Sequence, residues 1–336
     1  MVSESDISVK GHGVHTAYVE LTHALQKRSD CTVIVNDFTH QTSADVMHLH
    51  SLGLHAWRKL LFGKAKVKVI SAHVVPASFV GSIMLARFWL PLAKLYLGWA
   101  YRRADVVLAV SKMVAESLQK ELRVPSQKIT VFYNSIDTTQ YTPSAKKRAS
   151  ARKKLGITHS EFVVIGNGQV QPRKRLDTFI AMAHARPNFR FIWIGGIPFK
   201  FIGADYQNMQ KMMKNIPNNM IITGVIDLKD VKTYLAVADA FVLPAEQENH
   251  PMAVIEAAAA GLPIILRDIP EYDDTFGNDT LLAAKDAEFV AQLDRLYSDR
   301  QFRKEWHNKS MKIAKRFDST LAAEKLMKIY KEAISA

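Results

Sequence analysis

Cysteine is nearly absent from this sequence, and so are the residue spacings that mark common metal and nucleotide sites. Cys31 is the only cysteine in 336 residues, which excludes a disulfide framework and indicates a reducing compartment. The sequence contains no Cys/His spacing of the zinc type, no Walker loop, no internal repeat and no low-complexity tract. Residues 1–6 are polar and acidic, so we expect no signal peptide. These absences predict a cytoplasmic protein without a structural metal.

Acidic residues are fewer than basic residues in this sequence. The chain has 45 Lys and Arg against 32 Asp and Glu, which leaves a net charge of +13. Such an excess predicts an anionic partner, which can be a nucleic acid, an anionic lipid or a phosphate-bearing ligand. The hydrophobic content of 48% is sufficient for buried cores, and the length indicates two domains of ordinary size.

Short apolar and β-branched runs recur along the whole chain and predict strands. They occupy 2–5, 31–35, 46–50, 67–71 and 106–110 in the first half, and 162–166, 191–196, 220–223, 240–244 and 263–266 in the second. A helix or a loop separates each run from the next, which is typical of βαβ units with parallel strands. We therefore predict an α/β fold with one domain at 1–141 and another at 142–317.

The stretch Ala245–Gly261 is the centre of the functional prediction. It follows the apolar strand 240–244 and opens a helix, for which Asn249 or His250 can be the cap and Pro251 the first residue. A glycine at its end stops the helix. A strand, a polar elbow and a helix N-terminus form a site for an anionic ligand at the carboxyl edge of a parallel sheet.

Two carboxylates lie in this stretch with seven residues between them. Glu248 is in the loop before the helix, and Glu256 is on the helix among apolar residues. Two such groups can hold two sets of vicinal hydroxyls, whereas the alternative is an exposed loop residue and a residue of the helix surface. A carboxylate flanked by core requires a polar partner, which favours a binding role.

This spacing resembles the E-x7-E motif of the large family of retaining glycosyltransferases with the GT-B fold, in particular family 4. The resemblance implies that Glu248 holds the transferred sugar and that Glu256 holds the ribose of the nucleotide. It also implies two Rossmann-like domains that face a cleft, with the last helix, within 318–336, crossing back onto the first domain.

The segment after the first glutamate departs from the family pattern. The family has Gly-Phe-Gly there, whereas this sequence has Asn249-His250-Pro251. Because Pro251 has no N–H, Met252 or Asn249 would have to donate to a sugar hydroxyl. We include His250 among the candidate binding residues.

A basic turn precedes the predicted helix 176–185. Arg173 and Lys174 are placed to bind a diphosphate and to stabilise it as a leaving group, together with the free N–H groups of the helix start. The alternative is a solvated basic turn. The family loop reads Gly-Arg-x-x-x-x-Lys-Gly; here Gly168 and Lys174 match it, while Gln169 and Arg175 replace the arginine and the second glycine. By resemblance these cations make a metal cofactor unnecessary.

Two further candidates lie in the first domain. Gly11 and Gly13 belong to a glycine turn that opens a helix, which can approach a phosphate or a sugar or can be an ordinary turn. His73 comes just after a predicted strand, where a side chain faces the ligand edge of the sheet, although a structural histidine is the alternative. The resemblance places the glycine turn beside the acceptor and the donor phosphates, and His73 against the donor sugar.

The segment 81–103 approaches the length of a membrane span, about 20 residues, but Pro91 and charged residues interrupt it. Aromatic and cationic side chains around an apolar face suit a membrane interface, and a core helix is the alternative. The side chains concerned are Trp89, Tyr96 and Trp99 with Arg87, Lys94, Arg102 and Arg103. Together with His73-x-x-Pro-x-Ser78, they make the chain similar to bacterial glycosyl-diacylglycerol synthases.

The combined prediction is a UDP-sugar-dependent hexosyltransferase, peripheral on the inner face of the cell membrane. It would transfer glucose or galactose to a monoglycosyl-diacylglycerol or diacylglycerol acceptor, by the front-face substitution expected of the family. One alternative is the same fold acting on a soluble or polysaccharide-precursor acceptor. Another is a non-catalytic basic protein that binds lipid or nucleic acid. The set of Glu248, Glu256 and Lys174 argues against the latter, so we expect no nucleic-acid partner.

Overall fold

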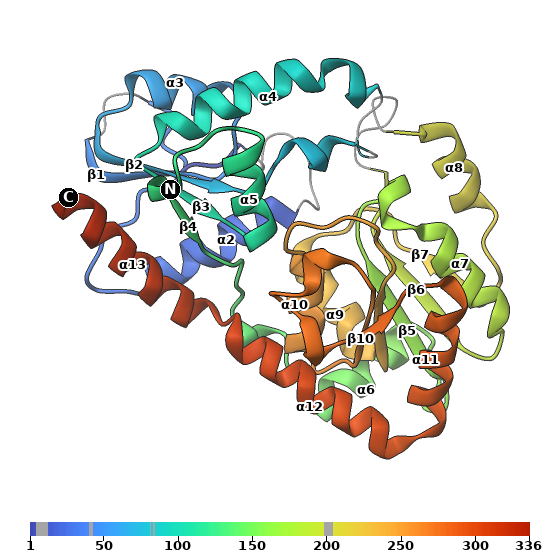
Figure 1. The fold of residues 1–336 in the computed structure, drawn as a ribbon. Helices are drawn as coiled ribbons and strands as arrows, with labels where there is room; N and C mark the ends of the chain where they lie inside the picture. Colours follow the sequence, from blue (N-terminus) through green and yellow to red (C-terminus); the bar gives the residue numbers. More distant parts are fainter. Residues whose placement is uncertain (5–12, 40–42, 81, 83–84, 198–203) are drawn as a thin grey trace. The chain divides into compact units, whose positions relative to one another are not determined.

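The computed structural model describes residues 1–4, 13–39, 43–80, 82, 85–197 and 204–336, and these form two compact units (Figure 1). The first unit comprises Met1–Val80, Leu85–Asp137 and Phe317–Ala336, and the second comprises Gly81–Met84 and Thr138–Arg316. The predicted boundaries put the changes of domain after residues 141 and 317, whereas the contacts change units after Asp137 and Arg316.

The sheet of the first unit has four parallel strands in the order β1-β2-β3-β4. Their bounds are β1 (Ala44–Leu49), β2 (Ala65–Ala72), β3 (Val106–Ala109) and β4 (Ile129–Val131). The predicted strand at 31–35 is wrong, because these residues have no regular structure. The edge of β1 is taken instead by Val2, which forms a parallel bridge with Leu49. The N-terminal amine of Met1 donates to the carbonyl of Ile34 at 3.0 Å, and the side chain of Ile34 is 44% exposed.

Helices cover both faces of this sheet because its side chains alternate between two cores. Val67 and Val69 pack with α2 and α13, whereas Ile70 and Ala72 pack with α3, α4 and α5. The helices are α2 (Gly13–Gln26), α3 (Leu54–Phe62), α4 (Ala86–Arg103), α5 (Lys112–Lys120) and α13 (Ser319–Ser335). The last helix, α13, thus packs on the first unit, where it contacts α2, β1 and β2.

The sheet of the second unit has six parallel strands in the order β10-β9-β8-β5-β6-β7. Their bounds are β5 (Val163–Asn167), β6 (Arg190–Ile194), β7 (Met220–Ile222), β8 (Ala240–Leu243), β9 (Ile264–Arg267) and β10 (Leu281–Ala283). The chain runs outward from β5 to β7 and then returns to the other side of β5. The order therefore reverses between β5 and β8, and ligands of open α/β sheets bind at the carboxyl ends of strands at such a point.

In the part of the second unit that the structure describes, seven α-helices accompany this sheet. They are α6 (Ala145–Lys154), α7 (Leu176–Ala185), α8 (Tyr206–Lys214), α9 (Leu228–Val237), α10 (Met252–Ala259), α11 (Asp286–Ser298) and α12 (Arg300–Arg316). Within the described part of the chain, no helix combines the length and the hydropathy that crossing a membrane requires. This includes α4, which continues through Pro91.

Candidate active site

Two loops that follow adjacent strands bring an ammonium group and a carboxylate together. The loop after β5 leads into the 3₁₀ turn η4 (Pro172–Lys174), and the loop after β8 carries Glu248. The ammonium of Lys174 donates to Oε1 of Glu248, and Nη1 of Arg173 lies 3.8 Å from Oε2. The N–H of Glu246 also donates to the carbonyl of Arg173 at 2.9 Å. Three predicted site residues therefore meet at one point of the second unit.

The Lys174–Glu248 pair is buried, with 9% and 6% of the two residues exposed. Burial lowers the pKa of Lys174 from its usual value, and the charge of Glu248 opposes this effect. A buried ammonium requires an opposite charge in contact with it. Among the described residues, Lys174 and Arg173 share one carboxylate, that of Glu248, which leaves one positive charge in excess in this cluster. An anionic ligand would complement it.

Arg173 is held from its other side by polar contacts. Its Nε donates to the hydroxyl of Ser82 at 2.8 Å, and its Nη1 donates to the carbonyl of Gln247 at 2.8 Å. The Ser82 hydroxyl in turn donates to Oε1 of Gln171 at 3.3 Å. These contacts fix the guanidinium next to Glu248, so that it need not be ordered when a ligand arrives.

Arg175 stands where the family pattern has glycine, and its backbone explains that preference. Its φ of 54° and ψ of 51° lie in the left-handed region, which costs a side-chain-bearing residue about 1–2 kcal/mol. Its guanidinium pairs with Asp177, Glu246 and Asp286. The hydrogen bond to Asp177 is the largest cause of its raised pKa. Arg175 is thus engaged by carboxylates and is not a further cation of the Lys174 cluster.

Glu256 lies on α10 and is only 3% exposed. The side-chain amide of Asn167, at the carboxyl end of β5, donates to its Oε2 at 3.1 Å. This is the polar partner that a carboxylate among apolar residues requires. Gly168 follows directly, and its carbonyl accepts from the indole N–H of Trp193 at 3.0 Å. A Cβ on Gly195 would lie 2.1 Å from that carbonyl oxygen, so this turn requires a glycine there.

The residues between the two glutamates pack into the second unit. His250 is 4% exposed and stacks on Phe276 with ring centroids 5.3 Å apart and planes at 12°. Met252 is the first residue of α10 and is 5% exposed. Asn249 accepts from the side-chain amide of Gln247 at 3.1 Å through its Oδ1. The imidazole of His250 therefore has an evident packing role beside its predicted binding role.

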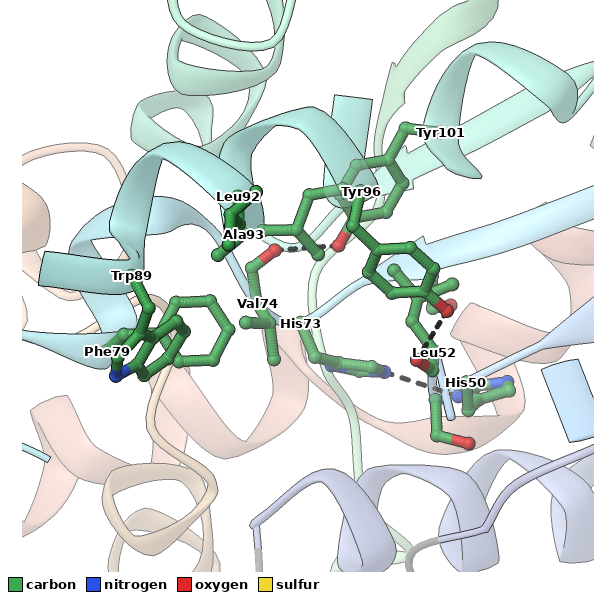
Figure 2. A pocket seen from close by; sticks show the side chains of 13 residues that line it. His50, Leu52, His73, Val74, Phe79, Trp89, Leu92, Ala93, Tyr96 and Tyr101 are labelled. Atoms are coloured by element: carbon green, nitrogen blue, oxygen red, sulfur yellow. Dashed lines mark hydrogen bonds between the residues drawn. The ribbon is translucent and has the colours of Figure 1, made fainter. Parts of the chain in front are cut away.

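His73 lies in the first unit, directly after β2, and belongs to a group of histidines (Figure 2). Its Nε2 is 3.2 Å from Nδ1 of His50, and the two rings are stacked. His48 lies behind His50 and is within hydrogen-bond distance of the hydroxyls of Ser71, at 2.8 Å, and Tyr330, at 2.6 Å. Burial lowers the pKa of both His48 and His50 well below 6.5, so both are neutral at pH 7.

The predicted glycine turn falls at the start of the first helix of this unit. Gly13 is the first residue of α2, whereas Gly11 lies outside the described residues. In the described part of the chain, no group of three or more His, Cys, Asp or Glu is placed to hold a metal ion.

Comparison with known proteins identifies the family. Residues 147–313 match the family of glycosyl transferases group 1, and residues 35–140 match Glycosyltransferase Family 4. The chain is 32% identical over 277 residues to the alpha-galactosylglucosyldiacylglycerol synthase of Streptococcus pneumoniae, which is 81% of this chain and 72% of that protein. This chain belongs to the group 1 glycosyltransferases. The family predicted from the E-x7-E spacing is thereby confirmed.

Another relative and two solved structures are similar to this glycosyltransferase in sequence or in fold. It is 28% identical to the processive diacylglycerol alpha-glucosyltransferase of Acholeplasma laidlawii over 68% of each chain. The Anabaena protein HepE, solved with UDP and glucose, matches with a TM-score of 0.71 at 17% identity over 85% of this chain and 77% of that one. Sucrose-phosphate synthase from Thermosynechococcus elongatus matches with 0.71 at 17% identity, covering 87% and 74%. The predicted GT-B fold class is confirmed.

Several residues that contact or lie near the predicted site residues were not predicted from the sequence. Asn167 was assigned to a loop, and the tyrosine Tyr272 in the 3₁₀ turn η6 (Pro270–Tyr272) was not considered. The hydroxyl of Tyr272 is buried without a hydrogen-bond partner among the described residues. Burial, followed by the charge of Glu248, raises its pKa. His48 and His50 could have been found, because β1 ends at the same sheet edge as β2.

Proposed function

We propose that this transferase moves glucose or galactose from a UDP-sugar to a glycosyl-diacylglycerol or diacylglycerol in a membrane, with retention of configuration. The buried cluster of Lys174, Arg173 and Glu248 at the switch point of the second sheet carries the proposal. Its excess positive charge suits a diphosphate, and its carboxylate suits sugar hydroxyls. The two relatives, an alpha-galactosylglucosyldiacylglycerol synthase and a processive diacylglycerol alpha-glucosyltransferase, support this acceptor.

In this proposal the charged side chains of the candidate site have separate roles. Lys174 and Arg173 stabilise the negative charge that develops on the β-phosphate as UDP leaves, so no metal ion is needed. Glu248 accepts from hydroxyls of the sugar, and Glu256, oriented by Asn167, accepts from the ribose hydroxyls. The N–H groups at the start of α10 add a positive dipole end.

The proposed acceptor requires contact with a membrane, and α4 offers a surface for it. Its exposed apolar side chains follow one another at intervals of three or four residues and therefore share one helix face. They are Phe88, Leu92 and Leu95, exposed by 82%, 70% and 69%, and the N-cap residue Leu85, exposed by 61%, precedes them. The neighbouring helix α3 adds exposed Leu54, Trp57 and Phe62.

The aromatic residues predicted at the interface turn the other way. Tyr96 and Trp99 pack against the core of the first unit, and the Tyr96 hydroxyl donates to the carbonyl of Leu52 at 2.8 Å. Lys94 pairs with Glu121 at 2.7 Å, whereas Arg102 and Arg103 at the end of α4 are exposed. We propose that this apolar face, with these arginines, rests on an anionic bilayer as a peripheral contact.

Release of UDP from UDP-glucose and UDP-galactose tests the proposal, measured with vesicles that contain or lack diacylglycerol and monoglucosyl-diacylglycerol. Mass spectrometry of the lipid fraction identifies the product. Release of UDP that depends on the lipid acceptor, with a hexose added to that lipid, is the expected result. Transfer only to water-soluble acceptors would favour the soluble-acceptor alternative. No turnover of any nucleotide sugar would contradict the proposal.

A further inference from the structure

The first unit contains a pocket of about 480 Å³, lined by His73 but otherwise by residues to which no ligand role was assigned (Figure 2). This volume is in the range of small-molecule sites. One wall is the inner face of α4, and the others come from the segments that follow β1 and β2. The apolar lining includes Phe79, Trp89, Leu92, Ala93 and Leu97. Phe79 and Trp89 contact each other edge to face with centroids 5.0 Å apart.

The tyrosines of the lining present their rings to the pocket while their hydroxyls are used elsewhere. The hydroxyl of Tyr96 donates to the carbonyl of Leu52 at 2.8 Å, and that of Tyr101 donates to the carbonyl of Val74 at 2.6 Å. Both phenols thus satisfy their polar atoms against the backbone. Most of the wall is therefore apolar, which suits a hydrocarbon ligand.

Polar groups gather in one part of the lining. His50 and His73 are hydrogen-bonded to each other, with Ser51 and Ser71 beside them. Figure 2 shows His50 on the side away from the Phe79–Trp89 pair, with His73 between them. Nε2 of His50 is buried without a hydrogen-bond partner among the described residues. A hydroxyl of a ligand would satisfy this atom, since a buried polar group left unpaired is unfavourable.

The pocket adjoins the exposed apolar face of α4. Leu92 lines the pocket and is nevertheless 70% exposed, so it belongs to both surfaces. Phe88 and Leu95 continue the same face on either side of it. A hydrocarbon chain could pass from a bilayer into the pocket along apolar side chains without crossing water.

From the apolar wall, the histidine end and the continuity with α4, we propose that the pocket binds one linear acyl chain of the lipid acceptor. The glycerol or sugar head then lies at the His50–His73 end. This inference rests on the proposed function and adds the place where the acceptor is held. It makes the length of the acyl chain a determinant of affinity.

Tryptophan fluorescence tests occupancy directly, because Trp89 lines the pocket. The probe is a monoacylglycerol with bromine atoms near the end of its chain, used below its critical micelle concentration and without vesicles. We expect saturable quenching in the wild type. The quenching should be lost in Trp89→Phe, and in Ala93→Phe because the new ring fills the pocket. Equal quenching in all three proteins would overturn the inference.

Acceptor kinetics provide a second, independent test. Each methylene added to a short acyl chain should lower KM about fourfold until the pocket is filled. Ala93→Phe should remove this dependence while keeping turnover of the shortest acceptor, and Trp89→Ala should move the preferred length upward. Ala115→Phe is the matched control, since Ala115 is a half-buried alanine of α5 outside the pocket. It should keep the wild-type dependence.

The outcomes separate this inference from the proposed function. If lipid acceptors react and both pocket variants keep the wild-type dependence on chain length, the acyl-chain site is wrong and lipid glycosylation stands. If no lipid acceptor of any length reacts while UDP-sugar is still hydrolysed, the proposed function itself fails. Thermal unfolding of each variant identifies a loss of activity that comes from misfolding.

Discussion

Lys174 and Glu248 are 74 residues apart in the chain and form a buried ion pair at the carboxyl edge of the second sheet. The sequence separation is bridged because β5 and β8 are neighbours in that sheet. Breaking a buried pair by removing one partner leaves an uncompensated charge, which is strongly destabilising. The pair therefore keeps both groups in place before any substrate binds.

Removal of Lys174 should weaken catalysis as well as stability, because it leaves the carboxylate of Glu248 buried without its ion-pair partner. Lys174→Met should cost about 2–4 kcal/mol of transition-state stabilisation, the usual size for one electrostatic partner in a closed site. We expect weaker binding of UDP and UDP-sugar alike, measured by calorimetry and by kcat/KM. In Lys174→Met combined with Glu248→Gln, the two effects should not add, because the residues are in contact. Additive effects would contradict the pairing. Chelators should leave wild-type activity unchanged.

Substitution of Glu256 and of Glu248 should change different kinetic constants. Glu256→Ala should mainly raise KM for the donor, because ribose contacts are the same in the ground and transition states. Glu248→Ala should mainly lower kcat, because its contact strengthens as charge develops at the anomeric carbon. Glu246→Gln is the control, since its exposed carboxylate pairs with Arg175 instead. Near wild-type kinetics in both alanine variants would refute the assignment.

Tyr272 offers a test in which stability and binding move in opposite directions. Its buried hydroxyl lacks a partner among the described residues, so Tyr272→Phe should stabilise the free protein by roughly 1–3 kcal/mol, the cost of an unpaired buried polar group. We expect weaker UDP-sugar binding at the same time. The Tyr272 hydroxyl is near enough to Glu248 to feel its charge, and we expect it to bond the sugar that Glu248 holds. Tyr101→Phe is the contrast, since its hydroxyl bonds Val74 and its loss should destabilise. A lower melting temperature for Tyr272→Phe would count against this account.

The neutral histidines of the first unit should make stability depend on pH. The pKa of His50 and of His48 lies well below 6.5 in the folded protein because both are buried, whereas an unfolded histidine titrates near 6.5. The unfolded chain therefore binds more protons below pH 6.5. Stability is full above that pH and should fall with decreasing pH by up to about 1.4 kcal/mol per unit for each histidine.

Urea unfolding between pH 7.5 and 5.5 measures this slope. His50→Asn should flatten it, whereas substitution of the exposed His184, on α7 of the second unit, by Asn should leave it unchanged. An equal slope in the wild type and His50→Asn would show that other groups cause the dependence.

Membrane contact by α4 should have an apolar part and an electrostatic part. Phe88→Ser and Leu95→Ser should weaken vesicle binding by up to about 1.5–3 kcal/mol each, the value of burying such a side chain. Charge reversal at Arg102 and Arg103 should remove the salt-sensitive part, while UDP-sugar binding persists. Sedimentation with anionic and neutral vesicles at two salt concentrations measures both. Leu321→Ser, at an exposed leucine of α13, should bind like the wild type.

The sequence was sufficient for the α/β fold class and for placing Glu248 and Lys174 at one sheet edge, because both follow local rules; their roles toward a donor stay a prediction. Apolar runs mark parallel strands, and residues just after such strands share one sheet edge. Glu248 and Lys174 could therefore be placed together without a structure. Their burial and the guanidinium contacts of Arg173 depend on residues far away in the chain and were not predictable.

Long-range packing also explains the errors. The run at 31–35 has strand composition, but Val2 takes the edge of β1 that it would need. The predicted orientation of α4 put Tyr96 and Trp99 at the surface. In the structure these two side chains pack against the core, and Phe88 and Leu95 are exposed instead. Asn167 carries no signal of its own, because its role exists only once α10 brings Glu256 next to it.

The packing of α13 sets an order for synthesis of the chain. This helix covers Val67, Val69 and Leu108 of the first sheet, and its Tyr330 bonds His48. The second unit, Thr138–Arg316, is translated before it. Because α2 also packs on this face, only the part that α13 covers must stay exposed during translation, or be held by a chaperone, while Thr138–Arg316 emerges and folds. Nascent chains stalled before Phe317 are expected to bind a hydrophobic dye that the finished protein does not.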